Sequence, residues 1–380
     1  MTASASKSSS RKPKIRIGIP KEVKIHEGRV GLTPEGAARL VRAGAEVRVQ
    51  KGAGVISGYP DAEYRKAGAK IASLAETWGK SDLIVKIKEL TPPEFRHLRR
   101  GMTLFSYLHL APDPAFTKAL LEKQVLAIDY EHVEMKNGAT PLLKPMSDVA
   151  GHLAITLGSY YLATHPQGAG LLLGGLSGIH SGEVVVVGAG TVGLASARQA
   201  LGIEANVTVL DISAAALKRA RKELGPRAKL VRSTPAALKK AVASADLLVG
   251  AVYSRGERAP KVISVDMIRS MKKGSLVMDV AIDQGGCIAT SRPTNHEEPL
   301  FVKHGVLHYC VPNMPGTVPQ TSTSAITSVT LPYVERMVKL GVEGALRRYP
   351  ELTRAVDTRD GQIIHEGVRK SLPALARRYG

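Results

Sequence analysis

The sequence predicts an α/β fold built from two Rossmann-like, doubly wound domains, of which the substrate domain is discontinuous. Its 380 residues are too many for one ordinary domain and suit two, each able to bury its own core. Short β-rich runs alternate with helical runs in two successive sets, as in parallel sheets covered by helices. A valine-rich run leads directly into the glycine-rich motif "VVVVGAGTVG" at 184–193. These three observations predict the fold class.

The first set of alternating elements begins near residue 14. "TPEGAARLVRAG" and "DPAFTKALLEKQ" have helical apolar spacing. Thr33 and Asp113 are the expected N-caps, because each precedes a proline at the first turn. The expected strands are "KIRIGIP", "AEVRVQKG", "SDLIVKIKE", "MTLFSYL" and "VLAIDYE".

A long apolar helix at 148–164 marks the crossing into the second set, whose helical runs include "SAAALKRARKEL". After "NMPGTVPQTST" a long helical stretch, interrupted at Pro332, returns to complete the first domain. We therefore expect a disordered basic tail at 1–14, a substrate domain at 15–147 and 319–380, and a nucleotide-binding domain at 148–318. The expected strands of the second set are "EVVVVGAG", "ANVTVLD", "AKLVRS", "ADLLVGAV", "GSLVMDVAID" and "VLHYC".

Composition narrows the class of protein. The net charge is +20, but the charges are scattered and aromatic residues make up only 4%, so no specific nucleic-acid partner is expected. No apolar run reaches the roughly 18 residues of a membrane span. Two cysteines, Cys287 and Cys310, cannot form a disulfide framework, and the polar start of the chain has no apolar signal core. A cytoplasmic location with both thiols buried fits best.

The elements around the glycine motif indicate a nucleotide-binding turn. It follows a strand and opens a helical run, and Asp211 ends the next strand 18 residues after Gly193. In this arrangement Gly188 permits the tight turn, Gly190 lets the backbone approach a pyrophosphate, and Gly193 lets helix and strand pack closely. Asp211 would bind the adenosine ribose and repel a 2′-phosphate, which favours NAD over NADP; alternatively it caps the helix that starts at Ser213.

Four polar residues stand where a core strand would not favour them. Arg29 lies in "HEGRVGLTP" and His109 in "FSYLHLA", while Lys86 and Lys88 in "LIVKIKE" fall on one face of an extended strand. Each has an ordinary structural explanation: a surface ion pair for Arg29, solvation at a strand end for Lys88, or a satisfied core imidazole for His109. Taken singly, those explanations would suffice.

The run "HGVLHYC" contains three potential metal ligands. His304, His308 and Cys310 would share one face of a strand. A buried strand explains this spacing more commonly, and no further ligand set is evident. We therefore expect no metal.

The motifs together resemble the alanine dehydrogenases, a family related to the nucleotide-binding subunit of the proton-translocating transhydrogenase. The resemblance runs from about residue 15 to about residue 349. Its motifs are "IPKE", "EGRVGLTP", "KIKE", "FSYLHLA", "PMSDVAG", "GAGTVG", "TVLD", "MDVAIDQGGC", "SRPT" and "NMPGTVPQTST".

The resemblance implies roles for individual residues. Arg29 and Lys88 would hold the substrate carboxylate and carbonyl, and His109 and Asp283 would be catalytic. A guanidinium fork suits a carboxylate, Lys88 can stabilise charge on oxygen, and an imidazole moves protons near neutral pH. Asp283, expected at the C-terminus of a strand, would orient water. The glycines and Asp211 would bind NAD, and Ser147 and Asn313 would lie near the nicotinamide and phosphates.

The implied activity is NAD-dependent interconversion of L-alanine with pyruvate and ammonia, in a cleft between the domains of a homo-oligomer, expected to be a hexamer. One alternative is another small amino acid, such as glycine formed from glyoxylate. Another is a transhydrogenase-like module that passes hydride to a partner, and a last one is a basic binding protein that has kept the fold.

Overall fold

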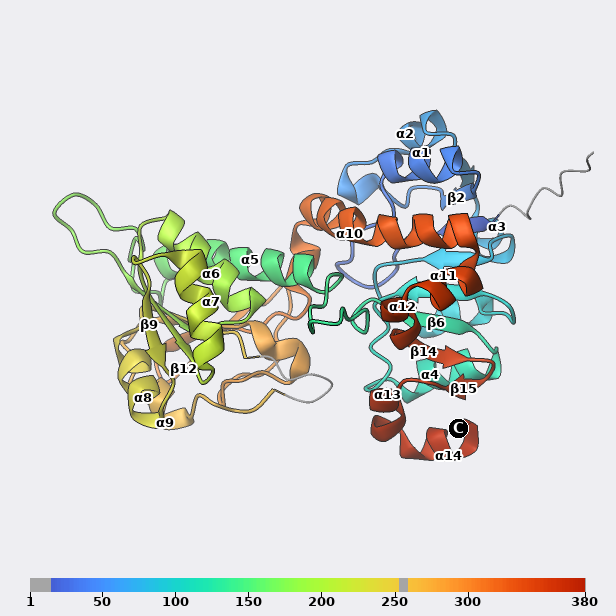
Figure 1. The fold of residues 1–380 in the computed structure, drawn as a ribbon. Helices are drawn as coiled ribbons and strands as arrows, with labels where there is room; N and C mark the ends of the chain where they lie inside the picture. Colours follow the sequence, from blue (N-terminus) through green and yellow to red (C-terminus); the bar gives the residue numbers. More distant parts are fainter. Residues whose placement is uncertain (1–14, 253–258, 380) are drawn as a thin grey trace, which may run out of the picture. The chain divides into compact units, whose positions relative to one another are not determined.

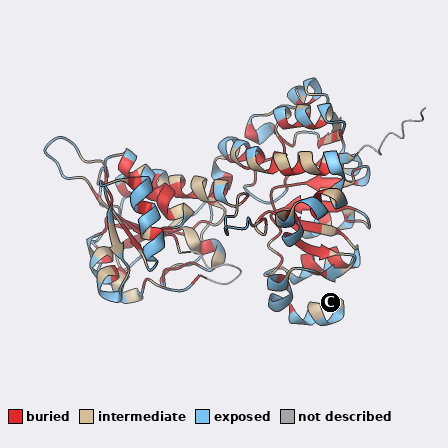
Figure 2. Cartoon of the chain, in the orientation of Figure 1, coloured by how far each residue is buried: buried red, intermediate tan, exposed pale blue. Residues whose placement is uncertain are grey.

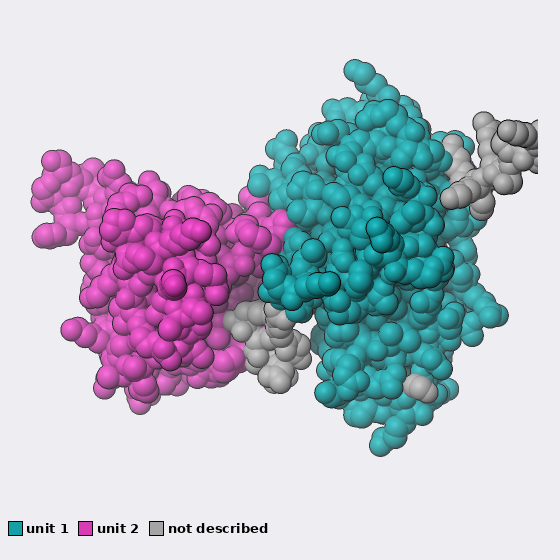
Figure 3. Space-filling view, viewed as in Figure 1, with its two compact units in different colours: residues 1–143, 319–380 teal, residues 144–318 magenta. Residues whose placement is uncertain are grey.

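A computed structural model of the chain describes residues 15–252 and 259–379, so the expected tail at 1–14 lies outside the described residues. The chain divides into two compact units (Figure 3). Unit 1 contains the described residues up to Leu143 and those from Pro319 onward, and unit 2 runs from Lys144 to Val318.

Unit 1 is built on an eight-stranded sheet whose order is β15-β14-β6-β5-β4-β1-β2-β3 (Figure 1). The pairings among β1 to β6 are parallel, while β14 is antiparallel to both β6 and β15. The strands are β1 (Arg16–Ile19), β2 (Glu46–Gln50), β3 (Lys70–Ala72), β4 (Leu83–Val85), β5 (Thr103–Ser106), β6 (Leu126–Asp129), β14 (Val356–Arg359) and β15 (Gln362–Ile363).

Two helices of unit 1, α1 and α4, begin where the sequence predicts. Thr33 and Asp113 accept hydrogen bonds from Gly36 N and Phe116 N, which confirms both N-caps. The helices are α1 (Pro34–Arg42), α2 (Asp61–Lys66), α3 (Leu74–Gly79), α4 (Pro114–Glu122), α10 (Pro319–Leu340), α11 (Val342–Arg348), α12 (Pro350–Arg354), α13 (Glu366–Ser371) and α14 (Pro373–Tyr379), with short 3-10 helices η1 (Val55–Ser57) and η2 (Pro92–His97).

Unit 2 contains a seven-stranded sheet in the order β12-β13-β11-β10-β7-β8-β9, in which β12 alone pairs antiparallel among the described strands. The strands are β7 (Glu183–Val187), β8 (Asn206–Asp211), β9 (Lys229–Arg232), β10 (Leu247–Gly250), β11 (Leu276–Asp279), β12 (Leu300–Lys303) and β13 (Val306–Tyr309). The helices are α5 (Lys144–Thr164), α6 (Thr191–Gly202), α7 (Ala214–Leu224), α8 (Pro235–Ser244), α9 (Val265–Arg269), η3 (Val280–Gln284) and η4 (Met314–Thr317).

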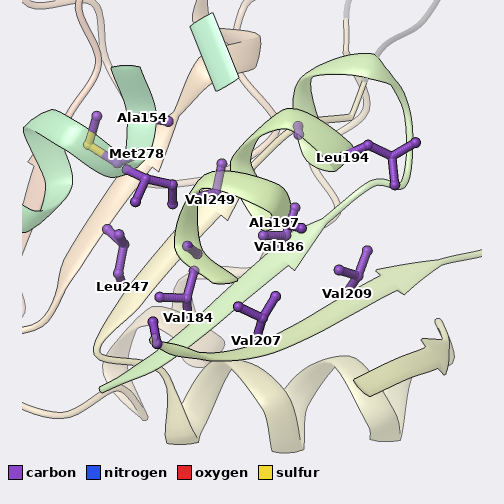
Figure 4. Close-up of a cluster of buried hydrophobic side chains, with 14 of the residues drawn as sticks. Ala154, Val184, Val186, Leu194, Ala197, Val207, Val209, Leu247, Val249 and Met278 are labelled. Atoms are coloured by element: carbon purple, nitrogen blue, oxygen red, sulfur yellow. The ribbon is translucent and has the colours of Figure 1, made fainter. Parts of the chain in front are cut away.

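In both units the central strands are buried and the outer helix faces are exposed (Figure 2), whereas the edge strands β9 and β12 of unit 2 contain no buried residue. Figure 4 shows the alternation that produces this in unit 2: Val184 and Val186 of β7 lie on the same side of the sheet as Val207 and Val209 of β8, next to Ala197 of α6. No helix in 15–252 or 259–379 is long and apolar enough to cross a membrane.

Several expected boundaries differ from the structure. The helix expected at 148–164 begins at Lys144, so the division between the units falls four residues before the expected one. The expected interruption at Pro332 is wrong, because α10 continues through it to Leu340. A proline removes one helical hydrogen bond, but Leu331, Tyr333 and Val334 are buried and hold the helix in place. Gly341, with φ +74°, ends it.

Candidate active site

Lys88 and His109 meet at the carboxyl edge of the unit 1 sheet. Lys88 follows β4 and His109 follows β5, its parallel neighbour. The Nζ atom of Lys88 lies 3.1 Å from Nε2 of His109. His109 has φ +47°, a left-handed conformation that residues other than glycine adopt infrequently and that clusters at functional sites. The structure therefore brings two of the predicted site residues into direct contact.

Two acidic residues that the sequence analysis missed lie beside this pair. Glu131, just after β6, places Oε2 3.7 Å from Nδ1 of His109. Glu89 places Oε2 3.4 Å from Nζ of Lys88 and also pairs with Lys24. Burial raises the pKa of Glu89, but Lys88, His109 and Lys24 outweigh it and lower the pKa to about 2. The position of Glu131 just after the parallel strand β6 was the one sequence feature that could have marked it as a site residue.

Arg29 is buried at the same edge. Its Nε and Nη2 donate to the two carboxylate oxygens of Glu27 at 2.7 and 2.5 Å. Burial lowers the pKa of Arg29, and Glu27 more than compensates. Burial raises the pKa of Tyr107, and the nearby positive charge of Arg29 opposes this rise. The ring of Tyr107 stacks with that of His109, with their centroids 6.4 Å apart. Tyr107 thus connects Arg29 to the Lys88–His109 pair.

Lys86 does not share a role with Lys88. The strand β4 ends at Val85, so the expectation that both lysines lie on one face of an extended strand is wrong. Lys86 is fully buried, and its Nζ bonds Glu22 and Glu94, both at 2.9 Å. These two ion pairs connect the end of β4 to the segments that carry Glu22 and Glu94, so Lys86 has a structural role.

The glycine turn of unit 2 follows β7, beside β10, where the order of the strands reverses. Gly188 has φ +109°, and a Cβ there would lie 2.4 Å from the carbonyl oxygen of Ala251. A Cβ at Gly193 would lie 1.8 Å from the Gly188 oxygen, whereas one at Gly190 would point into open space. The space before Gly190 and the amides at the start of α6 fit a pyrophosphate.

Asp211 ends β8 and holds the glycine turn. Its Oδ2 accepts a hydrogen bond from Ala189 N and its Oδ1 from Ser213 N, both at 2.7 Å. The alternative cap role is not observed, because the side chain of Ser213 caps α7 by accepting from Ala216 N. Asp211 therefore keeps its carboxylate beside the turn where a ribose would lie.

Asp283 and Asn313 also come together in unit 2. The expected place of Asp283 at a strand end is wrong, because β11 ends at Asp279 and Asp283 lies on the following η3. Asp279 binds the amides of Cys287 and Ile288 at 3.1 Å each, and this bends the chain away from the sheet. The carboxylate of Asp283 accepts the backbone amide of Asn313 at 3.1 and 3.3 Å.

Ser147 lies in the first turn of α5, one turn before Gly151. Gly151 permits close packing on the glycine-turn helix, because a Cβ there would lie 2.5 Å from Val192 O. The Gly151 carbonyl accepts a hydrogen bond from Ser196 of α6 at 3.1 Å. Ser147 is thus on a helix that packs directly against α6.

The histidines considered for a metal do not act together. His304 lies in the turn before β13, and His308 is buried in that strand. Nδ1 of His308 lies 2.9 Å from the Val306 carbonyl oxygen and Nε2 lies 2.7 Å from the Thr290 hydroxyl. Cys310 and Cys287 are free and buried, as predicted.

A glycine turn at the reversal of strand order, an acid at the end of the next strand and a charged cluster on the other unit define a two-unit oxidoreductase that uses a nicotinamide dinucleotide. The chain belongs to the alanine dehydrogenase/PNT family: the family's N-terminal domain model matches residues 18–150 and its C-terminal domain model matches residues 154–366.

Similar proteins agree with this assignment. An alanine dehydrogenase of Mycolicibacterium smegmatis is 44% identical over 94% of this chain and 96% of its own length. A solved L-alanine dehydrogenase structure has a TM-score of 0.92 at 40% identity, over 95% of this chain and all of that one. A transhydrogenase from Sinorhizobium meliloti, with a TM-score of 0.78 and 22% identity over 92% of this chain and 99% of that one, shares the fold.

Proposed function

We propose that the chain catalyses the NAD-dependent oxidative deamination of L-alanine to pyruvate and ammonia, and the reverse reductive amination. The contact between Lys88 and His109, at the edge that also holds Arg29, carries the proposal. This cluster combines a carboxylate-binding group, a cation for an oxygen and a proton carrier. The name shared by the relatives, over nearly their full length, supports alanine as the substrate.

Three residues of unit 1 would each have a separate role in the reaction of the amino acid. Arg29 binds the carboxylate of the substrate, with Glu27 fixing the guanidinium in place. Lys88 donates to the oxygen that water introduces at Cα and stabilises its negative charge. His109, oriented by Glu131, takes the proton from the attacking water and gives a proton to the departing ammonia.

A nicotinamide dinucleotide held by the glycine turn of unit 2 would supply the acceptor for the hydride that leaves the Cα of alanine. The substrate is thereby oxidised to an imine, and one proton leaves its nitrogen. Water adds to the imine carbon, and loss of ammonia gives pyruvate. Asp283 would orient this water, and its hydrogen bond to the Asn313 amide limits how the carboxylate can turn.

NAD is the proposed form of the cofactor because Asp211 is negative at the ribose position. A carboxylate accepts hydrogen bonds from ribose hydroxyls and repels a 2′-phosphate. Asn313 and Ser147 would contact the nicotinamide and phosphate portions. The dissociation constants of NADH and NADPH, measured by fluorescence titration, test the preference; tighter binding of NADPH would contradict it.

A homo-oligomer, with a hexamer as the specific expectation, is the proposed assembly. A loop between α5 and β7 projects from unit 2 (Figure 1) and carries exposed Leu172, Leu176 and Ile179. Apolar side chains gathered on a projecting loop favour contact with a second copy of the chain. Light scattering of the wild type and of Leu176→Asp tests this by measuring the mass of the assembly. An equal mass in both would show that the loop is not part of the interface. The free thiols favour a cytoplasmic location.

The decisive experiment measures NADH formation at alkaline pH with L-alanine, beside D-alanine, glycine and serine. The matched variant is Arg29→Lys, which keeps the charge beside Glu27 but loses the planar fork. Turnover with L-alanine that falls sharply in the variant supports the proposal. Faster turnover with glycine would indicate that the enzyme interconverts glycine and glyoxylate instead. NADH binding without turnover of any amino acid would instead indicate a partner-dependent hydride module.

A further inference from the structure

A cluster of two histidines and an aspartate lies in unit 1 and has no part in the proposed reaction. Nδ1 of His132 is 2.7 Å from Oδ1 of Asp357. The rings of His132 and His365 are stacked, with centroids 3.8 Å apart and planes 10° apart. One nitrogen or oxygen atom of each residue lies within 4.8 Å of the other two.

The backbone brings these side chains together from distant parts of the sequence. His132 follows β6, Asp357 belongs to β14, which pairs with β6, and His365 comes just after β15. The amide of Asp129 donates to the Ala355 carbonyl at 2.8 Å, and that of Ile364 to the Asp357 carbonyl at 2.7 Å. Main-chain hydrogen bonds therefore preform the cluster, independently of its side chains.

The cluster also contains buried polar atoms that lack a hydrogen-bond partner. Asp357 is fully buried, yet its Oδ2 has none. Nδ1 of His365 is likewise buried without a hydrogen bond. Such an atom costs stability unless something binds it, because it has lost water and gained no partner. An oxygen and an imidazole nitrogen in this condition, side by side, point to a ligand that accepts electron pairs.

We propose that His132, Asp357 and His365 bind a divalent transition-metal ion, with zinc as the best match. Two imidazole nitrogens and a carboxylate oxygen suit zinc, whereas magnesium and calcium favour oxygen ligands alone. Asp129, whose Oδ2 lies 3.9 Å from Nδ1 of His132, is available as a further oxygen ligand. The stacked imidazoles turn out of parallel on binding, so that both nitrogens face the ion.

The ion would link the C-terminal hairpin of β14 and β15 to the end of β6. Because the unfolded chain does not hold the three ligands together, binding stabilises the folded protein. The site is separate from the chemistry, although His132 directly follows Glu131, which contacts His109. Zinc should therefore raise the melting temperature and leave the turnover number nearly unchanged.

The test is a calorimetric titration of zinc into the full-length, chelator-treated protein, with the melting temperature measured in parallel. His365→Asn is the test variant, because His365 is partly exposed and its loss leaves the Asp357 contact with His132 in place. His180→Asn, in an exposed loop of unit 2, is the matched control. We expect one tight zinc site in the wild type and the control, weakened at least about tenfold in His365→Asn.

A second readout separates metal binding from a folding defect. Cobalt bound in place of zinc gives visible absorption bands that depend on its ligands, and His132→Gln should alter them or abolish them. Equal zinc affinity in the wild type and His365→Asn would overturn the proposal. So would a wild type that binds no zinc, or a cobalt spectrum that His132→Gln leaves unchanged.

Discussion

Lys88 and His109 lie 21 positions apart in the sequence, but their side-chain nitrogens are 3.1 Å apart because β4 and β5 are parallel neighbours that end at the same edge. An acid flanks each member of the pair: Glu89 lies 3.4 Å from Lys88, and Glu131 lies 3.7 Å from His109. The arrangement holds a cation and a proton carrier side by side.

Replacement of Lys88 by methionine should reduce kcat/KM for L-alanine by about a hundredfold or more, because the variant keeps the packing volume but removes the donor to the substrate oxygen. NADH binding should not change, since the glycine turn belongs to unit 2. Steady-state kinetics and NADH fluorescence titration measure the two effects. Lys24→Met, which removes a partly exposed lysine paired with Glu89, is the control and should stay near wild type. Equal losses in both variants would argue against a specific role for Lys88.

Alanine at Gly190 and at Gly193 should have different consequences. At Gly190 the added Cβ enters open space, so the protein should fold normally but bind NADH more weakly, because the methyl group occupies the pyrophosphate's place. At Gly193 the Cβ would collide with the Gly188 oxygen at 1.8 Å and should destabilise the unit itself. Melting curves and NADH titrations distinguish the two. An unchanged affinity for NADH in Gly190→Ala would place the pyrophosphate elsewhere.

The sequence predicted the fold well where its signals are local. Valine-rich runs, N-cap residues and the glycine turn are each fixed by a few adjacent residues. The strands β3, β12, β14 and β15 were not anticipated. These strands are short and lie at or near a sheet edge, and β14 depends on pairing with β6 more than two hundred residues earlier. Such pairing leaves no periodic pattern in the sequence.

The candidate site was predicted only in part, for the same reason. Arg29, Lys88 and His109 were identified by their unusual positions and by family motifs. Their partners Glu27 and Glu131 were missed, because acids near strand ends are common and only the folded chain shows which of them contacts the site. Asp283 was placed on a strand because "LVMDVAID" is continuously apolar apart from its acids. The hydrogen bonds of Asp279 to two later amides end the strand early, and no local pattern reveals them.

Lys86→Met should destabilise the protein by about 3–5 kcal/mol, because it leaves the carboxylates of Glu22 and Glu94 buried beside an uncharged chain. Burial lowers the pKa of Lys86, but these two carboxylates raise it further, so the lysine stays charged in the fold. Urea denaturation measures the loss. Lys80→Met removes a lysine from an exposed pair with Glu76 and should leave the denaturation midpoint nearly unchanged. Similar midpoints for the two variants would contradict a structural role for Lys86.

The protein should lose stability in mild acid through His308. Burial lowers the pKa of this histidine from 6.5 to about 4, so the folded state holds it neutral where the unfolded chain would protonate it. The stabilisation is complete above about pH 6.5 and declines as the pH falls toward 4, by about 3 kcal/mol in total. Neutral His308 can donate through Nδ1 to the Val306 carbonyl and accept the Thr290 hydroxyl at Nε2.

Urea denaturation between pH 4 and 8, compared between the wild type and His308→Leu, isolates this contribution. The variant should be less stable at neutral pH, because Thr290 loses its partner, but the difference from the wild type should shrink as the pH falls. His180→Asn, which removes an exposed histidine, should leave a difference that does not vary with pH. A constant difference between the wild type and His308→Leu would mean that His308 has the same pKa in the folded and the unfolded protein, and would contradict the lowered pKa.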